Sequence, residues 1–346
     1  MQSFKKALAA SLIFIVVTAL ISASLIIPFY RSEYMYYCDA ELRGGLAGTL
    51  DYIFVGASNG FAAFVPPVAD EVMGTNSYNL SGGLMTWYAR RVLLEKELER
   101  NPVKTVAVEI SYNSLWRQYR DAWGDSVFLS RLDTPAERAK FWLTNTSVKE
   151  WGNMYSNVLG SSIGYLSALV QNKILHKDVS LKNIDYALKN FHPKYESLQI
   201  PEAQRYKTGG EMDTYFVQRN VDELYAMIDL CKEKNIEVIL VVVPISEHEL
   251  FHFSNWNVME EKWADLAKDT DCPMIDFNLL KNRFELFHDP ESFADEVHMS
   301  KTGAEVFTAE YGKVMNMYKN GEDISDLFYS NYAEMKQDSD YLQNVG

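Results

Sequence analysis

Short apolar runs alternate with segments of helical periodicity along most of the chain. Runs rich in β-branched and aromatic residues are typical of buried strands, and they predict strands at residues 52–55, 77–83, 105–110, 236–243 and 273–277. Helical spacing predicts helices within residues 61–73, 85–99, 212–234, 263–268 and 301–318. Because the two patterns alternate, we expect an α/β fold, a three-layer sandwich with a mostly parallel central sheet.

Residues 115–210 interrupt this alternation. Helical patterns occur there at 134–143 and 161–174, with polar stretches between them. The glycine- and serine-containing segment 160–165 is typical of a helix start rather than of a phosphate-binding loop. We therefore expect residues 51–346 to form one domain with an insertion at about 115–210, which could serve as a lid or an acceptor-binding surface.

The amino-terminal segment has the pattern of a membrane anchor. Residues 7–27 form an apolar run that would span roughly 30 Å as a helix, enough for a hydrocarbon core. Lys5 and Lys6 precede it, so the positive-inside rule keeps residues 1–6 in the cytoplasm and sends the rest across the membrane, with 28–50 as a linker. A cleaved signal peptide is the alternative. In both cases we expect the domain to work outside the cytoplasm.

Composition narrows the possible functions. The 346 residues carry a formal net charge of −14 at pH 7, which argues against nucleic acid as a partner because phosphate contacts need an excess of Lys and Arg. The three cysteines, Cys38, Cys231 and Cys272, form no C-x-x-C pair. We therefore expect neither a zinc site nor a redox site, and no cofactor.

Residues able to do chemistry follow the predicted strands at their carboxyl ends. They are Ser58, then Gly82 or Gly83, then Asn113, and finally Asp295 with His298. The carboxyl ends of parallel strands lie at one edge of an open α/β sheet, so we expect these residues to meet in space. A serine hydroxyl is a poor nucleophile alone and needs a base to take its proton.

This order of residues resembles the SGNH hydrolase superfamily, once called the GDSL esterases, whose four blocks carry Ser, Gly, Asn and Asp-x-x-His. The strongest matches are Phe-Val-Gly-Ala-Ser at 54–58 and Asp-Glu-Val-His-Met-Ser-Lys-Thr-Gly-Ala at 295–304. The family's Gly-Asp-Ser is Gly-Ala-Ser here, and its Gly-x-Asn-Asp is Ser-Tyr-Asn-Ser at 111–114. The nucleophile elbow of α/β-hydrolases also fits residues 56–60, but that nucleophile follows several earlier strands, whereas Ser58 follows the first.

The resemblance implies a catalytic triad. Ser58 would attack an ester, His298 would take and return the proton, and Asp295 would orient the imidazole. The oxyanion would be held by the backbone N–H groups of Ser58 and of Gly82 or Gly83, with the Asn113 side chain.

A membrane-anchored member of the superfamily resembles the bacterial cell-envelope acyltransferases, including the D-alanyl-lipoteichoic acid transfer proteins and the exopolysaccharide and peptidoglycan O-acetyltransferases. This likeness implies a single-pass protein of the bacterial cell membrane with an extracytoplasmic carboxyl-terminal domain. Its substrate would be an envelope polymer or an acylated carrier, and a multispanning membrane protein would supply the acyl donor. Hydrolysis and transfer both stay open. The alternative is a non-catalytic binding or assembly factor that keeps the fold.

Three other polar positions have two interpretations each. His248 and His252 are four residues apart, as metal ligands on a helix would be. Pro244 places them on a loop, however, and we expect no metal site. Glu109 lies in the third predicted strand, where it could bond within the site or, as we expect, face the outside of an edge strand.

Overall fold

The computed structural model describes residues 2–29, 46–112, 114–115, 128–129, 131–146, 148–175, 188–199, 209–288 and 290–338. The chain forms two compact units. One consists of Met1–Arg43 and Arg120–Ile184, and the other of Gly44–Tyr119 and Asp185–Gly346. All the candidate site residues belong to the second, larger unit.

The larger unit is built on a five-stranded, all-parallel sheet in the order β2-β1-β3-β4-β5. The strands are β1 (Tyr52–Val55), β2 (Ser77–Asn79), β3 (Thr105–Glu109), β4 (Glu237–Val242) and β5 (Met274–Asp276). Each lies within one of the predicted runs, so the predicted α/β fold is confirmed. This strand order reverses between β1 and β3, and ligands of open α/β sheets bind outside the carboxyl ends of strands at such a switch point.

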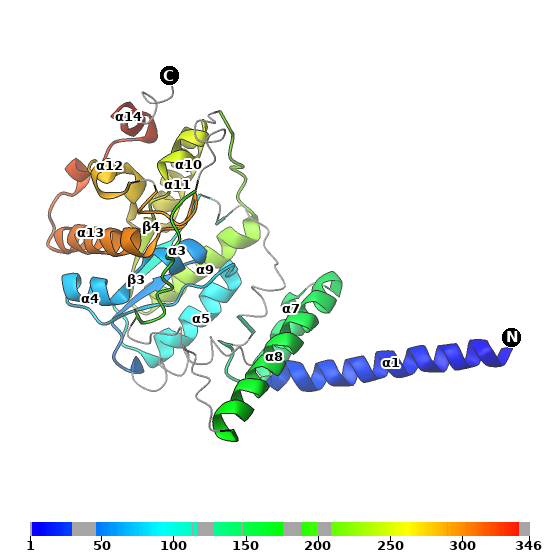
Figure 1. Cartoon of the computed structure of the whole chain (residues 1–346). Helices are drawn as coiled ribbons and strands as arrows, with labels where there is room; N and C mark the ends of the chain where they lie inside the picture. The colour runs from blue at the N-terminus through cyan, green and yellow to red at the C-terminus, as the bar shows by residue number, and fades with distance from the viewer. Residues whose placement is uncertain are drawn as a thin grey trace. The chain divides into compact units, whose positions relative to one another are not determined.

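Helices cover both faces of the sheet (Figure 1). On one face α13 (Lys301–Lys319) packs against α3 (Ser58–Ala63) and α4 (Pro66–Met73). On the other face α5 (Trp87–Arg100) packs against α9 (Gln218–Glu233), which also contacts β4. The sequence places the start of the α9 helix near residue 212, but the helix begins at Gln218.

Aromatic side chains fill the layer between the sheet and α13. Phe54 of β1 stacks on Phe64, with ring centroids 4.4 Å apart, and both are fully buried. The hydroxyl groups of Tyr52 and Tyr311 hydrogen-bond inside this layer, and Phe307 of α13 packs edge-on against Phe277. This core fixes β1 against α13, and therefore sets the positions of the segments that follow β1 and precede α13.

Among the residues that the structure describes, the larger unit also contains α10 (Glu247–His252), α11 (Trp256–Thr270), α12 (Arg283–Leu286) and α14 (Tyr332–Gln337). Short 3-10 turns lie at Phe277–Leu279 and Ser325–Leu327. The prediction of a loop around His248 and His252 is wrong. Ser246 caps α10, since its Oγ accepts a hydrogen bond of 3.2 Å from the backbone N–H of Glu249, and such a cap starts a helix soon after Pro244.

The smaller unit contains α1 (Gln2–Phe29), α7 (Pro135–Asn145), a 3-10 turn (Val148–Glu150) and α8 (Trp151–Lys173). Thr134 and Glu137 form a capping box at the start of α7. The prediction of a helix start at 160–165 is wrong, because α8 begins at Trp151 and runs through that segment. The predicted linker 28–50 lies largely outside the described residues, and the predicted domain boundaries stay a prediction.

Helix α1 contains an apolar segment, Phe4–Ser22, that is long enough and sufficiently free of charge to cross a membrane. Its large hydrophobic side chains, such as Phe14 and Leu20, are exposed within this chain. A signal sequence near the amino terminus can also meet these criteria of length and hydropathy.

Candidate active site

Ser58 is the first residue of α3 and follows β1 after a two-residue turn. The turn is tight because Gly56 faces Glu109 of β3: a Cβ built on Gly56 would lie 2.8 Å from Glu109 Cβ. Asn79 of β2 supports the far end of α3, donating hydrogen bonds of 2.9 Å to the carbonyl groups of Gly60 and Phe64. The neighbouring strands on either side therefore hold the segment that carries Ser58.

Asp295 and His298 lie on a compact loop before α13. Phe293 and Met299 close the loop with an antiparallel bridge, and Asp295 Oδ1 accepts hydrogen bonds from the backbone N–H groups of Val297 at 3.1 Å and His298 at 2.9 Å. The Asp-x-x-His spacing thus has a structural reason, because the carboxylate folds the loop that presents the histidine.

Gly303 belongs to the Gly-Ala pair that ends the motif at residues 295–304. A Cβ on Gly303 would lie 2.0 Å from the backbone oxygen of Ser292. Ser300 caps α13 by accepting a hydrogen bond of 3.1 Å from Gly303 N. A glycine at this position lets the first turn of α13 touch the backbone of the segment that leads into the Asp295 loop.

The imidazole of His298 has a defined tautomer. Its Nδ1 lies 2.8 Å from each carboxylate oxygen of Asp295. An ionised carboxylate can only accept hydrogen bonds, so Nδ1 carries the proton and Nε2 is left with a lone pair. Nε2 is buried and has no hydrogen-bond partner among the described residues. It is therefore available to accept a proton.

The ionised form of Asp295 is favoured. Burial by itself would raise the pKa of this carboxyl. The hydrogen bond from His298, the charge that this imidazole carries at the acidic pH where the carboxyl titrates, the charge of Lys194 and the N–H of Val297 together hold the pKa well below its ordinary value. Lys194 Nζ lies 3.1 Å from Asp295 Oδ2. The sequence does not point to Lys194, since it lies about a hundred residues from Asp295 with no motif around it.

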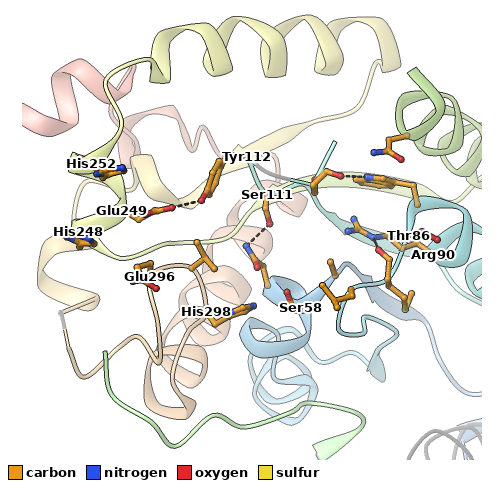
Figure 2. A pocket seen from close by; sticks show the side chains of 18 residues that line it. Ser58, Thr86, Arg90, Ser111, Tyr112, His248, Glu249, His252, Glu296 and His298 are labelled. Carbon is orange, nitrogen blue, oxygen red and sulfur yellow. Dashed lines mark hydrogen bonds between the residues drawn. The ribbon is translucent and has the colours of Figure 1, made fainter. Parts of the chain in front are cut away.

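Ser58 and His298 line one cavity of about 470 Å³ (Figure 2). Its other walls carry many polar side chains: Asn59, Thr86, Arg90, Ser111, Tyr112, Ser114, Asn220, His248, Glu249, His252 and Glu296. The structure contains no hydrogen bond between Ser58 Oγ and His298 Nε2, and catalytic hydrogen bonds are often long until substrate binds. The structure thus brings the predicted nucleophile and base to one cavity.

The predicted oxyanion residues are less clearly placed. Gly82 and Gly83 precede the stretch Leu84–Thr86, which lines the cavity, but the two glycines are not part of its lining. Gly82 uses its carbonyl to accept a hydrogen bond of 3.3 Å from Met85 N. Asn113 lies outside the described residues. The oxyanion hole therefore stays a prediction.

Glu109 is not at the outside of an edge strand, so that prediction is wrong. It lies on β3, a central strand, and its side chain is 0% exposed. Arg90 of α5, which is 2% exposed, places Nη1 4.0 Å from Glu109 Oε2. Burial lowers the pKa of the Arg90 guanidinium to about 10, although the charge of Glu109 opposes this. At that pKa the guanidinium stays charged near neutral pH, so the two groups form a buried ion pair.

The histidines of α10 and the two described cysteines, Cys231 and Cys272, differ in their surroundings. His248 and His252 line the cavity, but no group of three or more His, Cys, Asp or Glu side chains suited to a metal ion occurs among the described residues. Cys231 and Cys272 are buried free thiols. Burial raises the pKa of the Cys231 thiol to about 12, so it stays protonated and is not a nucleophile.

No family model matches the chain, and no curated protein matches it. Among solved structures it is similar to a GDSL-like lipase from Bacteroides thetaiotaomicron, at 10% identity and a TM-score of 0.37, over 83% of this chain and 100% of that chain. It is also similar to the lipase/acylhydrolase from Enterococcus faecalis, at 12% identity and a TM-score of 0.35, over 78% of this chain and 97% of that chain. Likenesses at these values give no information about the activity of this chain.

Proposed function

We propose that this protein is a serine esterase or O-acyltransferase that forms an acyl intermediate on Ser58. One observation carries the proposal: the Asp295 carboxylate holds Nδ1 of His298 at 2.8 Å, while the buried Nε2 stays without a partner among the described residues, in the cavity that Ser58 also lines. A neutral imidazole in this tautomer is the base that a serine nucleophile needs.

The chemistry would proceed in two half-reactions. Ser58 Oγ attacks the carbonyl carbon of an ester while its proton passes to His298 Nε2. The tetrahedral intermediate then collapses, the C–O bond to the alcohol breaks, and His298 returns the proton to the leaving oxygen. In the second half-reaction His298 takes a proton from water or from an acceptor hydroxyl, whose oxygen attacks the acyl carbon. The bond between the acyl carbon and Ser58 Oγ then breaks, and His298 returns the proton to Ser58 Oγ.

The cavity favours a small acyl group on a polar alcohol. At about 470 Å³ it has the size of a small-molecule site, and residues with hydroxyl, amide, imidazole or charged groups outnumber the apolar residues in its lining, although apolar atoms form about half of its surface. Long acyl chains need a continuous apolar channel, whereas a hydroxyl-rich polymer matches hydrogen-bonding walls. We therefore assign the activity to short acyl esters of a polar, hydroxylated polymer or acylated carrier, which fits the resemblance to cell-envelope enzymes.

The anchor completes the proposal. The Phe4–Ser22 segment of α1 would hold the protein in the bacterial cell membrane, with the cavity on the extracytoplasmic side. Tethering raises the concentration of an enzyme near a surface polymer. A multispanning membrane protein would then supply the acyl donor.

The function is tested with the full chain in detergent, using p-nitrophenyl acetate and p-nitrophenyl palmitate as esters. We expect hydrolysis of the acetate, at least tenfold slower hydrolysis of the palmitate, and loss of both activities in Ser58→Ala and His298→Ala. Adding a polysaccharide acceptor separates transfer from hydrolysis by the mass of the product. If Ser58→Ala retains the activity of the wild type, the proposal is wrong, and a non-catalytic binding role becomes the better account.

A further inference from the structure

Glu109 is a buried carboxylate that the two half-reactions do not use. It accepts three hydrogen bonds: Oε2 accepts from Ala57 N at 3.0 Å, and Oε1 accepts from Ser111 N at 2.7 Å and from the Ser111 hydroxyl. The Arg90 guanidinium also lies nearby, with Nη1 4.0 Å from Glu109 Oε2. Burying a carboxylate costs free energy unless hydrogen bonds and an opposite charge compensate for the lost hydration, and Glu109 has both.

The segment that Glu109 fixes is the one that carries Ser58. Ala57, which precedes Ser58, donates to Glu109 directly. Asn59, which follows Ser58, donates its Nδ2 at 2.8 Å to the hydroxyl of Ser111, which itself donates to Glu109. Both chain neighbours of the nucleophile are thus tied to a single carboxylate on the adjacent strand. Figure 2 draws the hydrogen bond that Ser111 accepts as a dashed line, with Ser58 below it in this view.

The glycines of the turn point to the same role. A Cβ on Gly56 would lie 2.8 Å from Glu109 Oε2, and one on Gly60 would lie 3.3 Å from Glu109 Cβ. Two glycines that flank Ser58 in sequence are therefore needed to bring the turn against Glu109. Arg90 completes the arrangement by donating from Nη1 to the Glu109 carbonyl at 3.3 Å and from Nε to the Met85 carbonyl at 3.3 Å.

We propose that Glu109, acting through Ala57 and through Ser111 and Asn59, is a positioning residue that holds Ser58 in its attacking orientation. Its role rests on the proposed function, since it has a meaning for catalysis only if Ser58 is the nucleophile. A displacement of a reacting atom by about 1 Å can cost on the order of 100-fold in rate.

The test uses the second-order rate constant for labelling of Ser58 by a fluorophosphonate, and kcat and KM for p-nitrophenyl acetate. Glu109→Gln replaces one acceptor oxygen with an amide donor that faces Ala57 N or Ser111, so we expect a tenfold or greater fall in kcat and in labelling rate, with KM unchanged. Since this variant also leaves Arg90 without its ion-pair partner, it could fail to fold.

Ser111→Thr and Ser111→Val provide the matched pair. Threonine and valine have nearly the same shape, but only threonine keeps the hydroxyl that joins Asn59 to Glu109. We expect Ser111→Thr to label at least fivefold faster than Ser111→Val at equal thermal stability. Equal rates for the two variants, in a wild type that labels, would overturn the positioning role and leave the proposed function intact. A wild type that neither labels nor hydrolyses the ester would overturn both.

Discussion

The carboxylate of Asp295 makes three contacts with His298. Both of its oxygens lie 2.8 Å from Nδ1, and its Oδ1 accepts a hydrogen bond of 2.9 Å from the His298 backbone N–H. One side chain therefore shapes the loop and also selects the tautomer of the imidazole. Both roles depend on the acceptor oxygens of the carboxylate. Replacing one oxygen can therefore change the tautomer of the imidazole while the other oxygen still holds the loop.

Asp295→Asn tests the tautomer. Asparagine keeps an Oδ1 that can accept from the backbone, but its amide group would donate to Nδ1 and place the imidazole proton on Nε2. His298 could then no longer take the proton from Ser58, and we expect kcat for p-nitrophenyl acetate to fall by roughly 10³- to 10⁴-fold. Steady-state kinetics measures the change.

Glu291→Gln is the control for that experiment. Glu291 is exposed and lies four residues before Asp295, so its replacement makes the same charge change without touching His298. We expect wild-type kinetics from it. An Asp295→Asn protein that keeps more than a tenth of the wild-type kcat would contradict the assignment of Asp295.

Gly303→Ala tests the packing of α13 on the segment that leads into this loop. A methyl group would meet the Ser292 carbonyl oxygen at 2.0 Å, and backbone cannot move aside as a flexible side chain can. We expect a loss of about 3 kcal/mol in the free energy of unfolding, measured by urea denaturation. Gly160→Ala is the control, because no atom lies within 4 Å of its added Cβ; on helix α8 it should be neutral or slightly stabilising. If the two variants were equally stable, the close packing of Gly303 on Ser292 would be contradicted.

Asp276 makes stability depend on pH. Burial raises its pKa from 3.8 to about 6, against the opposing hydrogen bonds of Tyr332 and Asn278 and the charge of Arg283. A raised pKa means that the folded state binds the proton more tightly, so the contribution of Asp276 is fully present below pH 3.8 and is lost as pH rises through about 6. A shift of this size corresponds to about 3 kcal/mol.

Asp276→Asn should remove that loss. Asparagine keeps an oxygen for the Asn278 N–H, 2.9 Å from Oδ1, and offers an amide to the Tyr332 hydroxyl, 2.7 Å from Oδ2. We expect the stability of the variant relative to the wild type to improve by up to about 3 kcal/mol between pH 4 and pH 7.5, followed by urea unfolding at several pH values. A constant difference across that range would show that Asp276 ionises normally.

The local pattern of apolar and polar residues was sufficient to predict the strands of the sheet. Five apolar runs each contained a strand of the sheet, since period and β-branched content report burial directly. The Asp295–His298 loop could also be anticipated, because its geometry is made by residues that are neighbours in sequence. Helix starts were harder: α10 depends on the Ser246 cap, and α8 begins at Trp151, well before the apolar pattern becomes clear.

Long-range contacts could not be read from the sequence. Glu109 was expected on an outer face because its strand position in the sheet was unknown, and only the order β1-β3-β4 buries it beside Ala57. Arg90 pairs with Glu109 and Lys194 with Asp295 although each pair is distant in sequence, and no motif predicts either contact. The position of Asn113 lies outside the described residues, so the third block of the resemblance stays a prediction.

The proposed reaction requires Ser58 to be an activated nucleophile. The most direct measurement is to treat the full chain in detergent with a fluorophosphonate, digest it, and locate the modified residue by mass spectrometry, with a known serine esterase in the same tube as a positive control. We expect a phosphonate adduct on Ser58, absent from Ser58→Ala and strongly reduced in His298→Ala. A wild-type chain without adduct while the control esterase is labelled, or an adduct that persists in Ser58→Ala, would contradict it.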